Sequence, residues 1–463
     1  MNICRTINFK KVTIILLLSS LLILVSTVAI ASSTSQPWSN TYGGQKDDSF
    51  NSVIQTSDGG YAAVGYTSPY ANNTTTIYFV KTNANGTLQW NNTYGGEKEA
   101  VGYGVVQTSD GGYAIAGYDI LNNSAMMAYL LRIDSNGNML WNKTFGSDDQ
   151  DGAYSIAKTS DGGFILTGFT YVYDSGGWDA FLIKTDAQGN VTWDRNYGGL
   201  FKDAGHSVEQ TSDGGYIFTG YTKSYGVLGG DANGVGAENL WLVKVDANGT
   251  EQWNKTFGGY DYDDGFAVDQ LSDGGYIVAG TTKSFYSNGT LRPAYDVNDT
   301  ARAYLIRTDA NGNEIWHKTY GGNHDTAIFS MDVVQDGFVL AGTTFSDRGD
   351  ADLLALKASL NGTGEWGYTY GGSEDDYGYS ICPADDGYVI AGNTKSFGSG
   401  GTDGYLIRIS DNGSGPSTIN NPGTNTENQP GQGTPFTYGI LVTVIIACVA
   451  IAALVIWKWI LRK

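Results

Sequence analysis

The sequence predicts an all-β fold: a seven-bladed β-propeller of four-stranded antiparallel blades, closed by its N-terminal strand and followed by one C-terminal transmembrane helix. Three observations predict it. An Asp-Gly turn motif recurs seven times, most fully as Thr-Ser-Asp-Gly-Gly-Tyr at 56–61. A tryptophan recurs seven times in phase with that motif. Glycine is abundant, with 65 residues, and proline is scarce, with 8, as many short strands joined by tight turns require.

The two repeated marks set the phase of the repeat. The turn aspartates are Asp58, Asp110, Asp161, Asp213, Asp273, Asp336 and Asp386. The tryptophans are Trp38, Trp90, Trp141, Trp193, Trp253, Trp316 and Trp366. A period of about 50 to 60 residues is typical of one propeller blade per repeat.

One period shows the four strands in order. Residues 103–108 alternate and run into the Ser-Asp-Gly-Gly turn, and residues 113–118 form the second strand. A variable loop leads to the third strand at 128–133. The Asp-Ser-Asn-Gly turn at 134–137 suits positive φ and introduces the fourth strand at 138–144.

The two ends of the array predict ring closure. The array begins with a fourth-strand motif at 38–41 and ends on a third strand at 405–409, with no tryptophan after it. The N-terminal strand is therefore expected to complete the last blade, which hides sheet edges that an open array would expose.

The segments outside the propeller predict the location. Residues 1–31 read as a signal peptide, with an uncleaved signal anchor as the alternative. The propeller spans 36–410 and a flexible polar linker 411–435. Residues 436–457 carry no charge and are long enough to span a bilayer, and 458–463 form a short basic tail. We expect a single-pass protein of the cell membrane, with the propeller extracellular and the C-terminus cytoplasmic.

The net charge of the chain limits the classes of partner that the protein can bind. The net charge is −20, and six of the basic residues lie in the two ends, so the propeller itself is more acidic still. This argues against nucleic acid as a partner. The body holds one cysteine, Cys382, which excludes a disulfide framework within it. Asn-x-Ser/Thr sequons agree with an extracellular glycoprotein and lie at Asn72, Asn73, Asn85, Asn91, Asn122, Asn142, Asn190, Asn248, Asn254, Asn288, Asn298, Asn361 and Asn412.

Antiparallel blades separate two faces. The constant Asp-Gly and Asn-Gly turns share one face. The loops between the second and third strands share the other with the blade-to-blade loops, and we call this the variable-loop face. It includes two long insertions, 223–239 and 283–302, to which Tyr225, Phe285, Tyr286 and Tyr295 are expected to give aromatic surface. Loops of this length are functional or passive decoration, and the sequence leaves both open.

Two sets of positions are candidates for a site. Ten residues before each turn aspartate stand Asp48, Ala100, Asp151, Asp203, Asp263, Thr326 and Asp376. These carboxylates would lie near the channel mouth and could hold Ca²⁺, or each would accept hydrogen bonds within its own loop. Seven residues before the turn stand Asn51, Tyr103, Tyr154, His206, Phe266, Phe329 and Tyr379, which could stack on sugars or pack between blades.

Catalytic signals are weak. The three histidines, His206, His317 and His324, lie on different blades without the spacing of metal ligands. We assign no catalytic, cofactor-binding or metal-ligating residue from the sequence. Ca²⁺ is the one cofactor that remains a candidate.

The fourth-strand region carries a family resemblance. Thr308-Asp-Ala-Asn-Gly-Asn-Glu-Ile-Trp316 resembles the tryptophan docking motif of quinoprotein-type propellers, and 186–193 and 246–253 match similarly. The resemblance implies blade packing through tryptophan. The adjacent cysteine pair of the quinone-binding enzymes is absent. The whole body is similar to cell-surface β-propeller repeat proteins of methanogenic archaea, which implies an envelope location.

The sequence therefore predicts a binding, adhesion or cell-envelope structural module that meets a glycan or an envelope protein through its variable-loop face. The alternative is an extracellular enzyme, carbohydrate-active or quinone-linked. An enzyme should show convergent polar residues in a pocket at the channel mouth, whereas a binding module should show a broad face with scattered aromatic residues.

Overall fold

A computed structural model describes residues 36–68, 74–96, 98–121, 125–146, 150–172, 177–226, 237–292 and 300–416. The chain divides into two units, 1–424 and 425–463, and every described residue lies in the first. The signal peptide, most of the linker, the transmembrane segment and the basic tail lie outside the described residues. Within the ranges given above, no helix could span a membrane.

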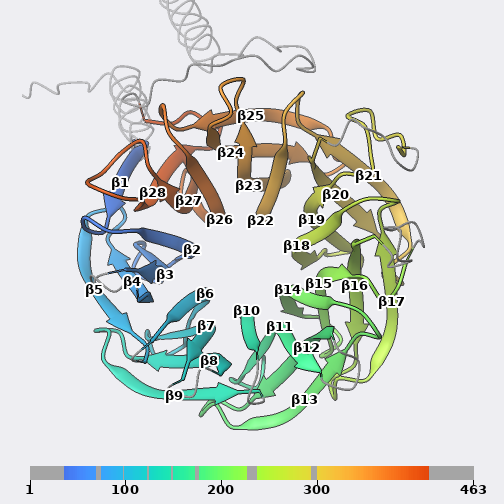
Figure 1. Ribbon diagram of the computed structural model, residues 1–463, viewed down its shortest axis with the longest axis horizontal. Coiled ribbons are helices and arrows are strands. Elements are labelled where there is room, and N and C mark those ends of the chain that lie inside the picture. The colour runs from blue at the N-terminus through green and yellow to red at the C-terminus, as the bar shows by residue number, and fades with distance from the viewer. Residues whose placement is uncertain are drawn as a thin grey trace, which may run out of the picture. The chain divides into compact units, whose positions relative to one another are not determined.

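Seven four-stranded antiparallel sheets form a ring of blades, which confirms the predicted seven-bladed propeller (Figure 1). Blades 1 to 3 comprise β2 (Asp48–Gln55), β3 (Tyr61–Thr67), β4 (Thr76–Thr82), β5 (Leu88–Tyr94); β6 (Ala100–Gln107), β7 (Tyr113–Ile120), β8 (Met126–Ile133), β9 (Met139–Phe145); and β10 (Asp151–Lys158), β11 (Phe164–Val172), β12 (Gly177–Thr185), β13 (Val191–Tyr197). Blades 4 and 5 comprise β14 (Asp203–Gln210), β15 (Tyr216–Thr222), β16 (Asn239–Val245), β17 (Glu251–Phe257); and β18 (Asp263–Gln270), β19 (Tyr276–Thr282), β20 (Arg302–Thr308), β21 (Glu314–Tyr320). Blade 6 comprises β22 (Thr326–Val334), β23 (Gly337–Phe345), β24 (Ala351–Ser359), β25 (Gly364–Tyr370), and blade 7 comprises β26 (Asp376–Ala384), β27 (Gly387–Thr394), β28 (Asp403–Ser410), β1 (Trp38–Tyr42).

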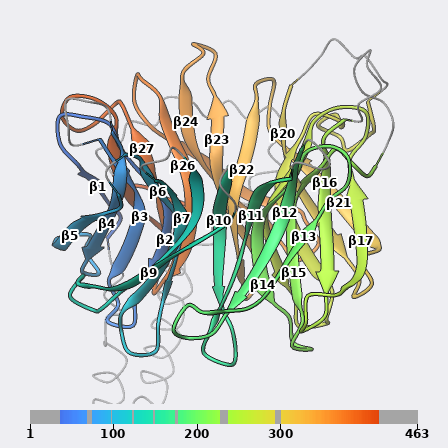
Figure 2. The ribbon, with the colours of Figure 1, turned by 60° about the horizontal axis from the view of Figure 1, so that its bottom comes forward.

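The ring closes as predicted. β1, the first strand of the chain, pairs antiparallel with β28, the last, from Trp38 opposite Arg408 to Tyr42 opposite Gly404. Blade 7 is thus built from both ends of the domain. In every blade the first strand is innermost and the fourth is outermost (Figure 1), and the strands run between the two faces (Figure 2).

Local contacts explain why the turn at 56–60 needs its threonine, its aspartate and its two glycines. Thr56 Oγ1 donates to Asp58 Oδ1 at 2.5 Å, and the same oxygen accepts the Gly60 N–H at 3.0 Å. Gly59 has a φ of +79°, which favours glycine. A Cβ on Gly60 would lie 2.1 Å from the Thr82 carbonyl oxygen and 2.7 Å from the ammonium of Lys81, so a side chain does not fit there.

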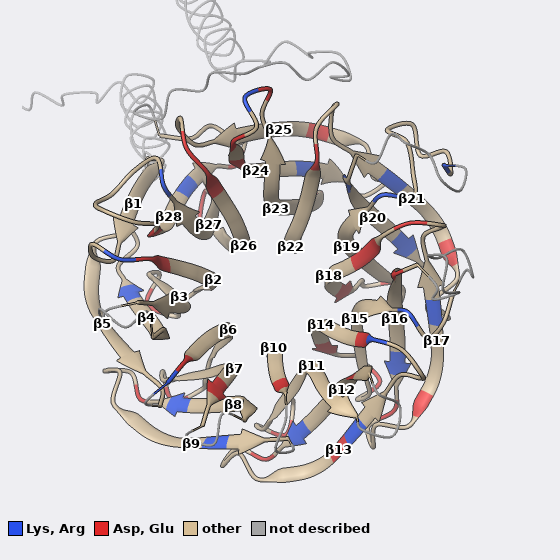
Figure 3. Cartoon of the chain, viewed as in Figure 1, with Lys and Arg blue, Asp and Glu red and all other residues tan. Residues whose placement is uncertain are grey.

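Lys81 is one of seven equivalent buried basic residues, of which each blade contains one. Lys81 is 4% exposed and binds Asp58 Oδ2 at 2.9 Å. The equivalent residues lie on the third strands, which carry blue bands in Figure 3. They are Lys81, Arg132, Lys184, Lys244, Arg307, Lys357 and Arg408. In blades 1 to 6 these cations bind the turn aspartates on the constant face, and each aspartate is more than half exposed.

The tryptophans and tyrosines of the outer strands join neighbouring blades. Trp193 in blade 3 packs on Tyr216 in blade 4, with ring centroids 5.7 Å apart, and touches the turn glycine Gly249. The Tyr197 hydroxyl donates to the Gly249 carbonyl at 2.6 Å. The same hydroxyl-to-turn contact recurs from Tyr42, Tyr94, Tyr320 and Tyr370. The expected packing of tryptophan between blades is therefore confirmed.

Candidate functional site

Each innermost strand carries a β-bulge, and the extra residue occupies the same position in all seven blades. In blade 2, for example, the pairing shifts between Gly102 and Gly104, which leaves Tyr103 as the extra residue. The seven bulge residues are Asn51, Tyr103, Tyr154, His206, Phe266, Phe329 and Tyr379. A bulge re-aims a side chain relative to the regular strand.

Six of these seven residues form a continuous chain of ring contacts around the inner strands. Centroid separations between successive blades are 5.1 Å for Tyr103 and Tyr154, 5.3 Å for Tyr154 and His206, and 4.9 Å for His206 and Phe266. They are 5.2 Å for Phe266 and Phe329, and 5.7 Å for Phe329 and Tyr379. These five contacts join neighbouring blades, which is the packing alternative that the sequence left open. Asn51 in blade 1 interrupts the chain because it has no ring.

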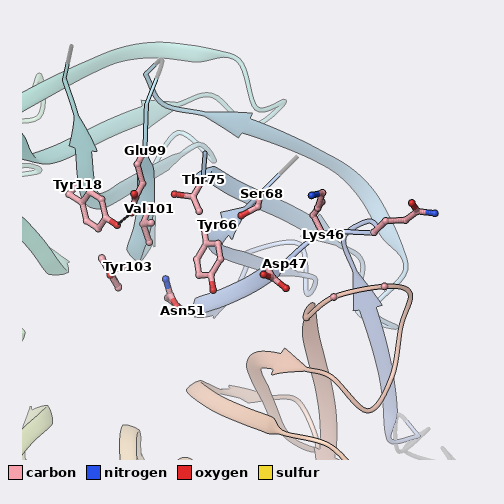
Figure 4. A pocket seen from close by; sticks show the side chains of 13 residues that line it. Lys46, Asp47, Asn51, Tyr66, Ser68, Thr75, Glu99, Val101, Tyr103 and Tyr118 are labelled. Atoms are coloured by element: carbon pink, nitrogen blue, oxygen red, sulfur yellow. Dashed lines mark hydrogen bonds between the residues drawn. The ribbon is translucent and has the colours of Figure 1, made fainter. Parts of the chain in front are cut away.

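A pocket of about 870 Å³ lies at this interruption (Figure 4). Its walls come from blades 1 and 2 and from the β27–β28 loop of blade 7. All the loops that contribute belong to the variable-loop face. The lining residues are Gln45, Lys46, Asp47, Asn51, Tyr66, Ser68, Thr75, Glu99, Val101, Tyr103, Tyr118, Gly400 and Gly401.

Both tyrosine rings and polar side chains line the pocket. The Tyr118 hydroxyl donates to Glu99 Oε1 at 2.5 Å (Figure 4). The Asn51 amide donates to the Gly102 carbonyl at 2.9 Å. Asp47 Oδ1 accepts the Thr402 N–H at 3.0 Å, which ties the rim to the β27–β28 loop. The polar groups of the wall are thus oriented before any ligand arrives.

The carboxylates make the pocket electronegative. Burial raises the pKa of Tyr66, and the charges of Asp47 and Asp48 raise it further. Burial also raises the pKa of Tyr103 and of Tyr118, with Glu99 adding to both. The three hydroxyls therefore keep their protons at neutral pH.

The aspartates ten residues before each turn lie elsewhere. Asp48, Asp151, Asp203, Asp263 and Asp376 open their strands and are at most 1% exposed. Four of them accept a glycine N–H from their own loop, from Gly44, Gly199, Gly259 and Gly372, at 2.7 to 3.0 Å. For these four carboxylates the alternative expectation, hydrogen bonding within their own loops, is therefore confirmed. The described residues include no cluster of three His, Cys, Asp or Glu side chains that could hold a metal ion.

The insertions differ in part from the expected aromatic surface. Tyr225 is 42% exposed, as expected. Phe285 is only 7% exposed and stacks on Tyr304 with ring centroids 5.4 Å apart, so the prediction for it is wrong because its side chain packs on blade 5. Arg292 lies over the Tyr286 ring at 5.3 Å. Tyr295 falls outside the described residues.

The histidines remain on separate blades. His317 bridges Glu314 and the Gly289 carbonyl, and His324 binds Asp347 at 2.6 Å. His206 is the bulge residue of blade 4, and its Nδ1 lies 3.2 Å from Asp264 Oδ1. The structure does not bring the three together.

Comparison with known proteins identifies the fold and no family. No family model matches the chain. A segment is 26% identical over 172 residues to the regulatory protein FlaEY of Caulobacter vibrioides, and the match spans 34% of this chain and 18% of that protein.

Solved structures give the same result. The chain is similar to a puromycin hydrolase mutant complexed with PGG, with a TM-score of 0.50 and 13% identity over 82% of this chain and 55% of that one. It is also similar to the WD40 β-propeller domain of Doa1, with a TM-score of 0.49 and 14% identity over 81% and 96% of the two chains. The propeller domain of the Trilobed protease from Pyrococcus furiosus gives 0.45 and 8% identity over 80% and 94%. Likeness at these identities concerns the fold alone.

Proposed function

We propose that this chain is an extracellular binding module that takes a saccharide in the pocket between blades 1 and 2. The observation that carries the proposal is the pocket itself, at the one place where the chain of bulge aromatics is interrupted. Three tyrosine rings line it, and Asn51, Asp47 and Glu99 lie among them. Aromatic faces pack against the C–H faces of sugar rings, while amides and carboxylates pair with sugar hydroxyls.

The membrane-anchored location belongs to this proposal. It is supported by the uncharged segment at 436–457 and the basic residues that follow it. Protease treatment of intact cells should digest the propeller and spare an epitope tag placed after residue 463. Protection of the propeller in intact cells would contradict the location.

Filling the pocket tests the binding function. Asn51→Phe places at blade 1 the kind of residue that the other blades already carry, so the fold should tolerate it. We expect titration calorimetry of the full-length chain against an oligosaccharide panel to show binding that Asn51→Phe weakens by about tenfold or more. Phe329→Tyr, at the same bulge in blade 6, is the matched control and should leave binding unchanged.

Two outcomes would contradict the proposal. Saccharide binding that survives Asn51→Phe would place the ligand elsewhere on the molecule. Release of shortened saccharides during the titration would favour the enzyme alternative, with Asp47 and Glu99 as the carboxylates to replace first.

A further inference from the structure

The junction between blades 4 and 5 is the structural counterpart of the pocket junction between blades 1 and 2. The bulge residue is His206 in the first case and Asn51 in the second. On the second strand, Tyr221 corresponds to Tyr66, since each lies opposite the residue that follows the opening aspartate. Across each junction lies the bulge residue of the next blade, which is Phe266 in blade 5 and Tyr103 in blade 2.

At the blade 4–5 junction the chain supplies its own basic ring. The His206 imidazole stacks on Phe266, with centroids 4.9 Å apart and an interplanar angle of 4°. Its ring centroid lies 5.8 Å from that of Tyr221, and its Nδ1 lies 3.2 Å from Oδ1 of Asp264, which is 2% exposed. Burial alone would lower the pKa of His206, but the charge and hydrogen bond of Asp264, the Gly265 backbone and the charge of Glu238 together outweigh burial and raise it. Aromatic faces and a buried carboxylate therefore favour a flat organic cation here.

At the blade 1–2 junction the aromatic surroundings remain, but Asn51 takes the place of the basic ring of His206. Tyr66 and Tyr103 occupy the places of Tyr221 and Phe266, and Asn51 is too short to fill the space. The carboxylate comes from Glu99, two residues before the position of Asp264. A tyrosine hydroxyl orients the carboxylate in both junctions: Tyr118 donates to Glu99 at 2.5 Å, and Tyr262 donates to Asp264 at 3.1 Å.

The charges that line the pocket also favour a cationic ligand. Two carboxylates, Asp47 and Glu99, and one ammonium, Lys46, line the pocket. Lys46 and Asp47 are exposed at the rim, whereas Glu99 is half-buried beside the tyrosine rings. The interior wall therefore presents negative charge and π faces.

From this correspondence we propose that the pocket recognises a cationic saccharide, with the protonated amine of an amino sugar between Tyr66 and Tyr103 and paired with Glu99. The proposal rests on the saccharide-binding function above and specifies the charge of the ligand. An ammonium on an aromatic face and beside a carboxylate gains from both contacts. An N-acetylated sugar of the same ring size has no such charge.

Matched ligands and variants test the proposal. The full-length chain is titrated with a glucosamine tetramer and with the N-acetylglucosamine tetramer, at mildly acidic pH where the sugar amine is protonated. We expect the glucosamine tetramer to bind about tenfold tighter or more. Glu99→Gln still accepts the Tyr118 hydroxyl, and should abolish this preference while leaving the acetylated ligand unaffected. Asn51→His should abolish binding of both ligands, because it restores the ring of blade 4. Asp194→Asn, on the exposed outer strand β13, is the control for loss of one negative charge.

The outcomes separate the two proposals. Equal or tighter binding of the acetylated tetramer would overturn the cationic ligand and leave the saccharide function standing. A glucosamine preference that survives Glu99→Gln, or that Asp194→Asn removes equally, would show general attraction to an acidic surface and would overturn the inference. A tetralysine peptide that binds as tightly as the glucosamine tetramer would overturn the saccharide part. Failure of every saccharide to bind would overturn the proposed function itself.

Discussion

The buried cation beneath each Asp-Gly turn is the most regular residue-level feature of the molecule. In blade 1 the ammonium of Lys81 also donates to the Thr82 carbonyl at 2.8 Å and to Gln89 at 3.0 Å. Burial would raise the pKa of Asp58, but the hydrogen bonds from Thr56, Lys81 and Gly60 and the charge of Lys81 together outweigh burial and lower it to about 2. The aspartate is exposed and the lysine is buried. Loss of the partner therefore leaves the lysine charge buried and unpaired, whereas the aspartate charge stays in contact with water.

This asymmetry predicts the order of two substitutions. Asp58→Asn leaves a buried ammonium without its counterion and should cost about 1 to 2 kcal/mol of unfolding free energy. Lys81→Met fills the same space without a charge and leaves only a solvated carboxylate, so it should cost less. Denaturant midpoints of the two variants and of the double variant measure the order. A larger loss of unfolding free energy for Lys81→Met would mean that packing, and not charge pairing, stabilises the turn.

A second residue-level prediction concerns pH. Burial raises the pKa of Asp332 on β22 to about 6. The folded chain holds this proton more tightly than the unfolded chain, so ionised Asp332 destabilises the fold. The penalty is absent below the unfolded pKa of about 4 and grows as pH rises through about 6. Asp332→Asn should therefore raise the unfolding free energy by about 2 kcal/mol at neutral pH and change it little in acid.

Thermal unfolding across pH checks this sign. Asp194→Asn, on the exposed face of β13, is the control. A gain from Asp332→Asn that is the same in acid and at neutral pH would contradict the assignment.

At the scale of elements, contacts between outer strands and the next blade hold the sheets side by side. The Tyr197 hydroxyl is buried and reaches across to the Gly249 carbonyl. The Tyr-Gly-Gly sequence at 197–199 therefore serves two blades at once: its tyrosine reaches one turn of the next blade, and the following loop leads into that blade.

Tyr197→Phe should remove this contact while keeping the ring. Because the Gly249 carbonyl loses a partner inside the structure, we expect a loss of about 1 kcal/mol in unfolding free energy. Tyr225→Phe is a matched control, since its hydroxyl also donates to a carbonyl but its side chain is exposed. Equal losses for the two variants would contradict the role of burial.

Local signals explain why the strands could be predicted and the pocket could not. Asp58 and Gly59 specify a turn within five residues, and the period-two alternation beside it specifies two strands. The buried Lys81 could also have been found, because it is a single basic residue in phase within an apolar strand. The bulges have no such signal, since the shift appears only when two strands pair. Asn51 makes a pocket only because its neighbours are aromatic, and that relation depends on how the blades meet.

At the scale of the whole molecule, ring closure depends on a five-residue strand. β1 pairs with β28, and Trp38 packs on Tyr61 of blade 1 with centroids 5.9 Å apart. The Tyr42 hydroxyl contacts the Gly86 carbonyl, also in blade 1. β1 therefore completes blade 7 and joins it to blade 1.

Deleting residues 36–42 should open the ring. The exposed edge of β28 and the lost contacts with blade 1 should lower the thermal midpoint by several degrees and promote association between chains. Limited proteolysis and size-exclusion chromatography measure the two effects. A peptide of residues 36–42 added in trans should restore part of the midpoint, and an unchanged midpoint without it would contradict the closure.

The shared blade also decides how the domain bears tension. A pull applied beyond residue 416 acts first on β28, which is hydrogen-bonded along one side to β27 and along the other to β1. The load must shear two ladders together rather than peel a single outer strand. Closure by β1 therefore gives this side of the propeller two ladders of hydrogen bonds against a pull, where an open ring would have one.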